Sequence, residues 1–171
     1  MKVYADKLVE TLKQKSLRIF IVSGDEPLLV QESCDVVRRG LKAQGFVGRD
    51  LFYAEQGFDW NGLLYSSNSM SLFAEKKLIE VRLPTGKPGD AGGKVLTKLV
   101  SSLSDDNALL LVLPRADQST QRTKWFKSVE AVAGFVQVWP IEAKELPRWL
   151  ENRFTPIPRA AMRRYWLSSA I

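Results

Sequence analysis

Apolar and polar residues alternate along the chain in blocks whose lengths suit strands and helices in turn. Five short apolar runs predict β-strands at residues 19–22, 51–53, 78–83, 108–113 and 135–139. Between them, apolar positions at helical spacing predict helices at residues 5–15, 27–44, 94–102, 120–133 and 145–154, with another that opens at Asp59. Strands written as continuous apolar runs are buried on both faces. The alternation therefore predicts a three-layer α/β domain with a five-stranded parallel sheet over residues 1–140.

Turn-forming residues mark several of these boundaries. Pro27 suits the first turn of a helix, where its missing N–H would have no partner, and Gly45 is expected to end the same helix. Asp59 is expected to cap the next helix with its carboxylate. Residues 84–93 hold four Gly and two Pro, so they are expected to form a surface loop.

The composition excludes several kinds of chemistry. The 171 residues include 25 Lys and Arg, 19 Asp and Glu, one Cys and no His. Without histidine there is no Ser-His-Asp triad, no Cys-His pair and no His-ligated zinc or haem. The lone Cys34 cannot complete a disulfide or a multi-cysteine metal site within the chain, and it is expected to be a small buried residue. We therefore predict no catalytic residue, cofactor or metal ligand.

Charge and hydropathy suggest where the protein acts. The net charge of +6 raises nucleic acid or an anionic surface as a partner, without locating a patch. Charged residues occur from Lys2 onward, and no apolar run approaches the ~20 residues of a membrane span. A cytoplasmic protein is expected, because a single cysteine also suits a reducing compartment.

A nucleotide site would be expected where the first strand turns into the first long helix, because ligands bind beyond the carboxyl ends of parallel strands. A phosphate loop has the pattern G-x-x-x-x-G-K-[ST] at this place. This chain has instead Ser23-Gly24-Asp25-Glu26-Pro27, with one glycine, no lysine and two acids that would repel phosphate. The strand at 108–113 runs into Pro114-Arg115 rather than into an acidic pair for Mg²⁺. ATP hydrolysis is therefore not expected, and the Gly24-Asp25 turn is interpreted as a cap of the helix.

Three blocks of sequence resemble a known family in their order and spacing. They are GDEPLLVQES at residues 24–33, DW at 59–60 followed by MSLFA at 70–74, and LPRW at 146–149. Over residues 1–154 the chain thereby resembles the delta subunit of the bacterial DNA polymerase III clamp loader. The resemblance implies an AAA+ or RecA-like fold with a degenerate nucleotide site over residues 1–140. It also implies that residues 141–171 begin a small helical second domain.

The same resemblance implies a function and its partners. The delta subunit binds the ring-shaped beta sliding clamp and holds one interface open, while ATP-hydrolysing subunits place the ring on primed DNA. Its partners are then the clamp and the other clamp-loader subunits, with DNA reached only indirectly and no membrane. The subunit is not an enzyme by itself, and the terms DNA-directed DNA polymerase, nucleotidyltransferase and transferase would apply only through the holoenzyme. The family continues with a collar domain, whereas this chain departs from the family pattern at residues 155–171, which leaves open a truncated form, a frameshifted reading or a short natural form.

In that family a hydrophobic pair in the M-S-L-F segment grips the clamp, and the matching residues here are Leu72 and Phe73. The residue types support this, because an apolar triplet of Met70, Leu72 and Phe73 lies between polar residues 66–69 and charged residues 75–77. Such a triplet suits a hydrophobic pocket on a partner. The alternative is that Leu72 and Phe73 only cap the sheet of their own domain, and for Met70 an inward orientation is equally open.

Other residues leave further alternatives open. The basic residues Lys94, Lys98, Arg115, Arg122, Lys124 and Lys127 form either a solvated face or a surface that meets a neighbouring subunit or DNA. The tryptophans 60, 125, 139 and 149 are interpreted as core or domain-packing residues. Two other functions remain as alternatives to the clamp-loader function: a nucleotide-binding enzyme with a divergent P-loop, and a basic nucleic-acid-binding domain.

Overall fold

The computed structural model describes residues 1–14, 16–68 and 76–154. The chain divides into two compact units, Met1–Trp139 and Pro140–Ile171. Helix α7, Leu146–Phe154, belongs to the second unit and follows the prediction for 145–154 closely. The first unit contains the sheet and the helices around it.

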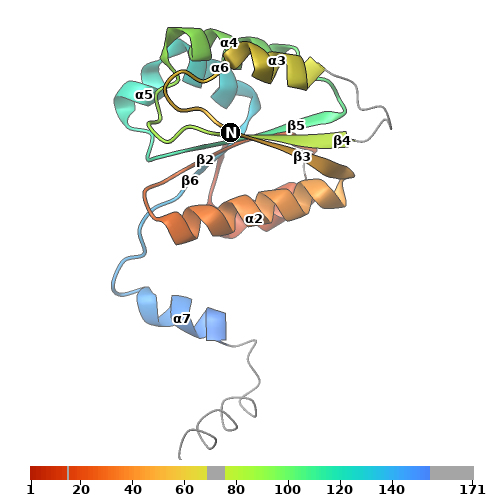
Figure 1. Ribbon diagram of the computed structural model, residues 1–171. Helices are drawn as coiled ribbons and strands as arrows, with labels where there is room; N and C mark the ends of the chain where they lie inside the picture. Colours follow the sequence, from red (N-terminus) through yellow and green to blue (C-terminus); the bar gives the residue numbers. More distant parts are fainter. Residues whose placement is uncertain (15, 69–75, 155–171) are drawn as a thin grey trace, which may run out of the picture. The chain divides into compact units, whose positions relative to one another are not determined.

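The described part of the first unit forms a sheet of six strands, and every neighbouring pair is parallel. The order across the sheet is β1-β6-β2-β5-β4-β3, and Figure 1 labels all of these strands except β1. The strands are β1 Lys2–Val3, β2 Ile19–Ser23, β3 Phe46–Tyr53, β4 Lys76–Arg82, β5 Asn107–Leu113 and β6 Gly134–Gln137. The α/β class and the parallel sheet are therefore confirmed.

The predicted count of five strands is wrong, because the sheet has a sixth strand, the edge strand β1, that the sequence pattern does not indicate. Two residues are too few to show any periodicity, so this strand is defined by its partner and not by its own sequence. The carbonyl of Met1 accepts a hydrogen bond from the N–H of Phe135 at 2.8 Å, and the terminal ammonium donates to the carbonyl of Ala133 at 2.8 Å.

Helices cover both faces of this sheet (Figure 1). One face carries α1 and α2, and the other carries α3, α4 and α6 with the short α5. The helices are α1 Leu8–Gln14, after a 3-10 turn at Ala5–Lys7, α2 Pro27–Ala43, α3 Trp60–Asn68, α4 Gly89–Ser101, α5 Gln118–Arg122 and α6 Lys124–Val132. Pro27 lies in the first turn of α2, and Gly45 follows the end of α2 with a φ of 97°. Both boundary predictions are confirmed.

The two central strands show why their sequences are continuously apolar. Every residue of β2 and β5 is buried. In β2, Ile19 and Ile21 face the core under α3, α4 and α6, whereas Phe20 and Val22 face the core under α1 and α2. Because successive strand residues point to opposite faces, a strand between two helical layers needs apolar residues at every position.

Some predicted boundaries are wrong where local sequence preference is weak. Helix α4 begins at Gly89, within the predicted loop, although glycine costs about 1 kcal/mol per residue in a helix. Its glycines are needed for packing: Gly92 lies against the ring of Trp60, and a Cβ on Gly93 would lie 3.3 Å from the side chain of Trp125.

The edge strand β3 begins at Phe46 and not at residue 51. Its first part contains glycine and charged residues, which strands disfavour, so the sequence shows little sign of it. The helix predicted at 120–133 is two helices, because Thr123 has extended backbone between α5 and α6.

Candidate functional site

The carboxyl edge of the sheet, where a phosphate loop would lie, is closed by hydrogen bonds within the protein. The hydroxyl of the fully buried Ser23 donates to the carbonyl of Pro114 at 2.9 Å and accepts from the N–H of Ala116 at 2.8 Å. The Asp25 carboxylate accepts from the N–H of Arg115 at 2.9 Å. These bonds tie the turn after β2 to the turn after β5 and use the groups that a ligand would otherwise meet.

The backbone at this turn is also packed too tightly to surround a phosphate. A Cβ on Gly24 would lie 2.8 Å from the Cβ of Val138 and 2.9 Å from its carbonyl oxygen. The N–H of Gly24 donates to the carbonyl of Leu113 at 3.2 Å, and the N–H of Val138 donates to the carbonyl of Ser23 at 2.7 Å. The N–H groups that line a phosphate loop point toward the anion, whereas that of Gly24 points back into the sheet.

The interpretation of the Gly24-Asp25 turn as a helix cap is wrong. The N-cap of α2 is Glu26, whose side chain makes no capping hydrogen bond, and Pro27 fills the first turn. Asp25 is instead the link to Arg115. By contrast, the predicted cap of α3 is confirmed, since the Asp59 carboxylate accepts from the N–H groups of Asn61 and Gly62, both at 3.0 Å.

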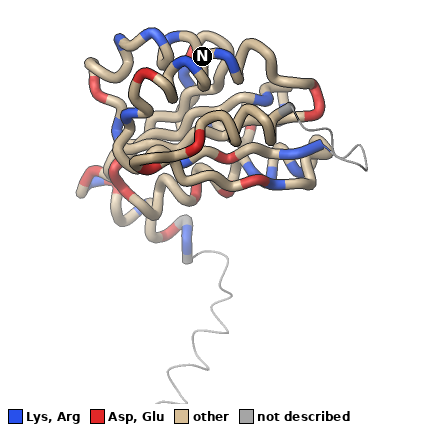
Figure 2. The backbone as a smooth tube through the Cα atoms, turned by 45° about the horizontal axis from the view of Figure 1, so that its top comes forward, with Lys and Arg blue, Asp and Glu red and all other residues tan. Residues whose placement is uncertain are grey.

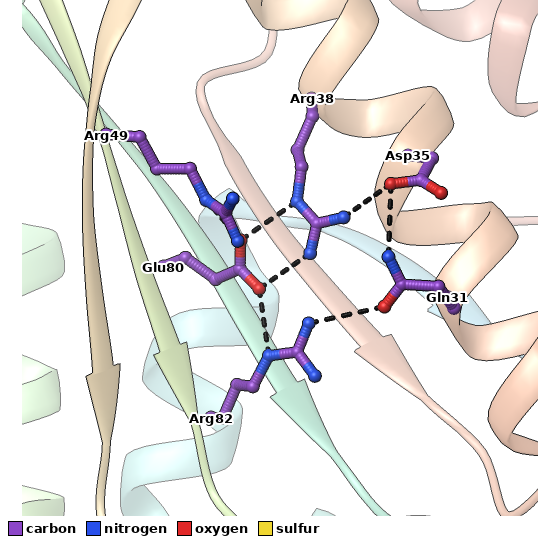
Figure 3. A network of polar contacts seen from close by, with 6 residues as sticks. All are labelled: Gln31, Asp35, Arg38, Arg49, Glu80 and Arg82. Carbon is purple, nitrogen blue, oxygen red and sulfur yellow. Dashed lines mark hydrogen bonds and ion pairs between the residues drawn. The ribbon is translucent and has the colours of Figure 1, made fainter.

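A buried carboxylate lies between α2 and the sheet, where three arginines surround it (Figure 3). Glu80 of β4 is fully buried. Arg38 of α2 donates to its two oxygens at 3.0 and 2.8 Å, Arg49 of β3 donates at 3.1 Å and Arg82 donates at 3.0 Å. Asp35 pairs with Arg38 at 2.5 Å. The cluster therefore joins the middle of α2 to two strands.

Burial and the neighbouring arginines have opposite effects on the pKa of Glu80. Burial alone would raise the pKa of the Glu80 carboxyl, but the hydrogen bonds and charge of Arg38, with the charge of Arg49 and a hydrogen bond from Arg82, hold that pKa below its usual value. A carboxylate with this many arginine donors has no oxygen left for a metal ion. Among the residues that the structure describes, no group of three or more His, Cys, Asp or Glu could hold one either.

At the amino edge of the sheet, polar side chains bind the end of α3 and not a neighbouring turn. Asn107 at the start of β5 donates to the carbonyl of Ser67 at 2.6 Å in a buried bond. Lys77 near the start of β4 donates to the carbonyl of Ser66 at 2.6 Å and pairs with Asp50 at 3.0 Å. Side-chain hydrogen bonds therefore join the end of α3 to the starts of β4 and β5.

The predicted clamp-binding residues Met70, Leu72 and Phe73 belong to the connection between α3 and β4. They lie outside the described residues, so their role stays a prediction. The residues that hold both ends of this connection were not singled out from the sequence. Asn107 and Ser67 are 40 positions apart, and isolated polar residues at such separation have no recognisable pattern.

The other singled-out residues have mixed outcomes. Cys34 is fully buried as predicted, and burial raises the pKa of its thiol to about 11, so it is unreactive. Trp125 is buried and Trp60 packs against the same core, but Trp139 is 53% exposed, with the guanidinium of Arg115 4.5 Å from its ring centre. Trp139 is therefore not a core residue, and its alternative role in domain packing stays a prediction. No helix in the described ranges is long and apolar enough to span a membrane.

The first unit matches a known protein family. A family model described as "DNA polymerase III, delta subunit" matches residues 20–138. The DNA polymerase III subunit delta of Escherichia coli (strain K12) is 29% identical over 153 residues, which are 90% of this chain and 45% of that protein. The same subunit of Haemophilus influenzae (strain ATCC 51907 / DSM 11121 / KW20 / Rd) is 26% identical over 89% of this chain and 45% of its own length.

A solved structure has a similar fold. The Bacillus subtilis DNA clamp loader delta protein aligns with a TM-score of 0.66 and 18% identity, over 86% of this chain and 46% of that one. The chain thus spans about half the length of the relatives it matches. Since the family match covers residues 20–138 of the 171, the chain belongs to the DNA polymerase III delta subunit family.

Proposed function

We propose that this chain is the clamp-binding part of a clamp-loader delta subunit of AAA+ type. It binds the beta sliding clamp through Leu72 and Phe73, with Met70 beside them, and strains the ring toward an open state. Other clamp-loader subunits supply the ATP hydrolysis and place the ring on primed DNA in the bacterial cytoplasm. The chain itself needs neither cofactor nor catalytic residue.

The observation that supports this proposal most is the polar frame on either side of residues 69–75. The carbonyls at the end of α3 are fixed by Asn107 and Lys77, each at 2.6 Å. A segment that presents apolar side chains to a partner binds more tightly when its two ends are already ordered, because less conformational entropy is lost on binding. Leu72 and Phe73 would each contribute ~1.5–3 kcal/mol by burial in a pocket.

The test is a titration of fluorescently labelled beta sliding clamp with the chain. The Leu72→Ala/Phe73→Ala variant is expected to bind at least about a hundredfold more weakly, which corresponds to the burial energy of the two side chains. A matched control is Tyr4→Ala/Leu28→Ala, which removes an aromatic and a leucine that are 76% and 52% exposed elsewhere. Equal affinity of the double variant and wild type, with both folded by circular dichroism, would refute the proposal.

A nucleotide-dependent enzyme is disfavoured by the carboxyl edge. Ser23 and Asp25 already bind the backbone of residues 114–116, and the two acids of the turn oppose a phosphate. Titration with ATP and Mg²⁺ is therefore expected to give no saturable signal. Saturable binding that Asp25→Lys strengthens would support the enzyme instead.

A basic nucleic-acid-binding domain is the remaining alternative. Binding driven by phosphate neutralisation weakens steeply as salt rises and needs no clamp. We expect clamp binding to depend only modestly on salt, because an apolar pair carries it. Clamp-independent binding of an oligonucleotide with a steep salt dependence would favour this alternative.

A further inference from the structure

A second surface of the first unit is a groove of about 950 Å³ between α4, α5 and α6, next to the turn that precedes α4. Its wall is mostly apolar and includes Pro88, Gly89, Gly93 and the ring of Trp125. Four lysines line it as well: Lys87, Lys94, Lys98 and Lys124. The helices over this face carry several of the basic stretches coloured blue in Figure 2. The groove lies on the face of the sheet opposite α1 and α2.

The lysines have mixed effects on the fold, since Lys98 lies in the last turn of α4, where a positive charge is favourable. Lys94 and Lys98 lie four residues apart on α4, where like charges repel each other. Lys124 is the first residue of α6, next to the positive end of the helix dipole. Among the described residues, these three lysines form no ion pair. The lining has four lysines against one aspartate, Asp90, and this net positive charge favours a partner that brings negative charge.

The hydroxyl groups in the groove argue against a small phosphate ligand. Thr97 donates to the carbonyl of Gly93, Thr123 to that of Thr120 and Ser128 to that of Lys124, at 2.8, 2.6 and 2.9 Å. These hydroxyls therefore have no proton left for an anion.

One carboxylate, that of Asp90, lines the groove, and Asp117, the N-cap of α5, lies next to the lining residues Ser119 and Thr120 in the sequence. The Asp117 carboxylate accepts from the N–H of Thr120, and this bond, with hydroxyl donors, lowers its pKa to about 2, so it stays charged. Asp90 occupies the first turn of α4, where a bound anion would be most favoured. Any anionic partner would therefore have to place its charges beside the lysines and away from Asp90 and Asp117.

We propose that this groove binds an acidic amphipathic helix of a protein partner. Its apolar side would pack on Pro88 and on the small exposed part of Trp125, and its carboxylates would meet the lysines along α4 and at the start of α6. Helices pack well into the furrow between two other helices, and helix-in-groove recognition uses anchors at helical spacing. The proposal does not rest on clamp binding.

The test selects ligands without a bias in charge. A phage-displayed library of helical peptides, with all surface positions randomised, is selected on the full chain. The same library is selected in parallel on the Lys94→Glu/Lys98→Glu/Lys124→Glu variant. Enriched peptides are expected to be acidic, with apolar residues at i, i+3, i+4 and i+7. A synthetic copy is expected to lose at least about tenfold in affinity for the triple variant.

A matched control keeps the change of net charge the same. Lys13→Glu/Arg39→Glu/Lys42→Glu alters three exposed basic residues on α1 and α2, on the other face of the sheet, and is expected to bind the peptide like wild type. The proposal is overturned if no peptide is enriched, if the peptides are basic, or if the control loses as much affinity. It is also overturned if a 20-nucleotide single-stranded DNA, and no peptide, binds in a way that requires the groove lysines.

Discussion

The two edges of the sheet differ in what their polar side chains do. At the carboxyl edge, Ser23 and Asp25 bind the backbone of the neighbouring turn and close the place where this kind of sheet usually receives a ligand. At the amino edge, Asn107 and Lys77 hold the end of α3 and leave the α3–β4 connection between fixed ends. Similar hydrogen bonds thus remove a site at one edge and frame a candidate binding segment at the other.

The largest expected effect on stability comes from the Glu80 cluster, which joins α2 to the sheet and includes none of the residues named at the two edges. Glu80→Ala leaves three arginines around a buried vacancy in place of a carboxylate, and we expect a loss of about 3–5 kcal/mol in the free energy of unfolding. Urea unfolding followed by circular dichroism measures this loss. The matched change Glu55→Ala, at an exposed glutamate, is expected to stay within about 0.5 kcal/mol. Equal stability of the two variants would mean that the cluster does not hold α2 to the sheet.

A smaller effect, specific to the amino edge, is expected for Asn107→Ala. It leaves the buried carbonyl of Ser67 without its donor, which costs about 1–3 kcal/mol in unfolding free energy. Because the frame at the end of α3 loosens, affinity for the sliding clamp is expected to fall several-fold at a temperature where the variant is folded. Unchanged affinity would mean that the hydrogen bonds at the end of α3 do not contribute to clamp binding.

Ser23→Ala is the counterpart at the carboxyl edge. It leaves the N–H of Ala116 without its acceptor in a buried place, with a similar cost of about 1–3 kcal/mol. Affinity for the clamp is expected to stay within twofold of wild type, since no binding residue is assigned to this edge. If Asn107→Ala and Ser23→Ala have similar stability and lose the same affinity, the difference between the two edges has no role in clamp binding.

The smallest expected effect is a pH dependence of the stability that the Glu80 cluster contributes. The folded-state pKa of Glu80 lies below its ordinary value of 4.5, so its ion pairs stabilise the fold above that pH and lose their contribution as pH falls through the folded-state pKa. The difference in unfolding free energy between wild type and Glu80→Gln is expected to be constant from neutral pH to about 5 and to shrink below. A difference that grows on acidification would contradict the assigned charge state.

Much of the fold could be predicted, because strands buried on both faces, such as β2 and β5, have long apolar runs that the sequence shows directly. The parts that were missed are defined by partners far away in the sequence. Strand β1 exists through its bonds to residues near β6, and the glycines at the start of α4 are helical because Trp60 and Trp125 pack on them.

The candidate site divides in the same way. The loss of a phosphate loop could be predicted from missing residue types at known positions. The bonds that close the turn involve Ser23 and the residues after β5, about 90 positions apart, so no local pattern reveals them. Met70, Leu72 and Phe73 came from the resemblance to the family, and their role stays a prediction.

One experiment tests the central claim most directly: the affinity of labelled beta sliding clamp for two variants compared side by side, Leu72→Ala/Phe73→Ala and Ser23→Ala. We predict that the double variant loses at least about a hundredfold in affinity while remaining folded, and that Ser23→Ala stays within twofold of wild type. Retained binding by the double variant, or a comparable loss in Ser23→Ala at equal foldedness, would contradict the assignment of clamp binding to the amino edge.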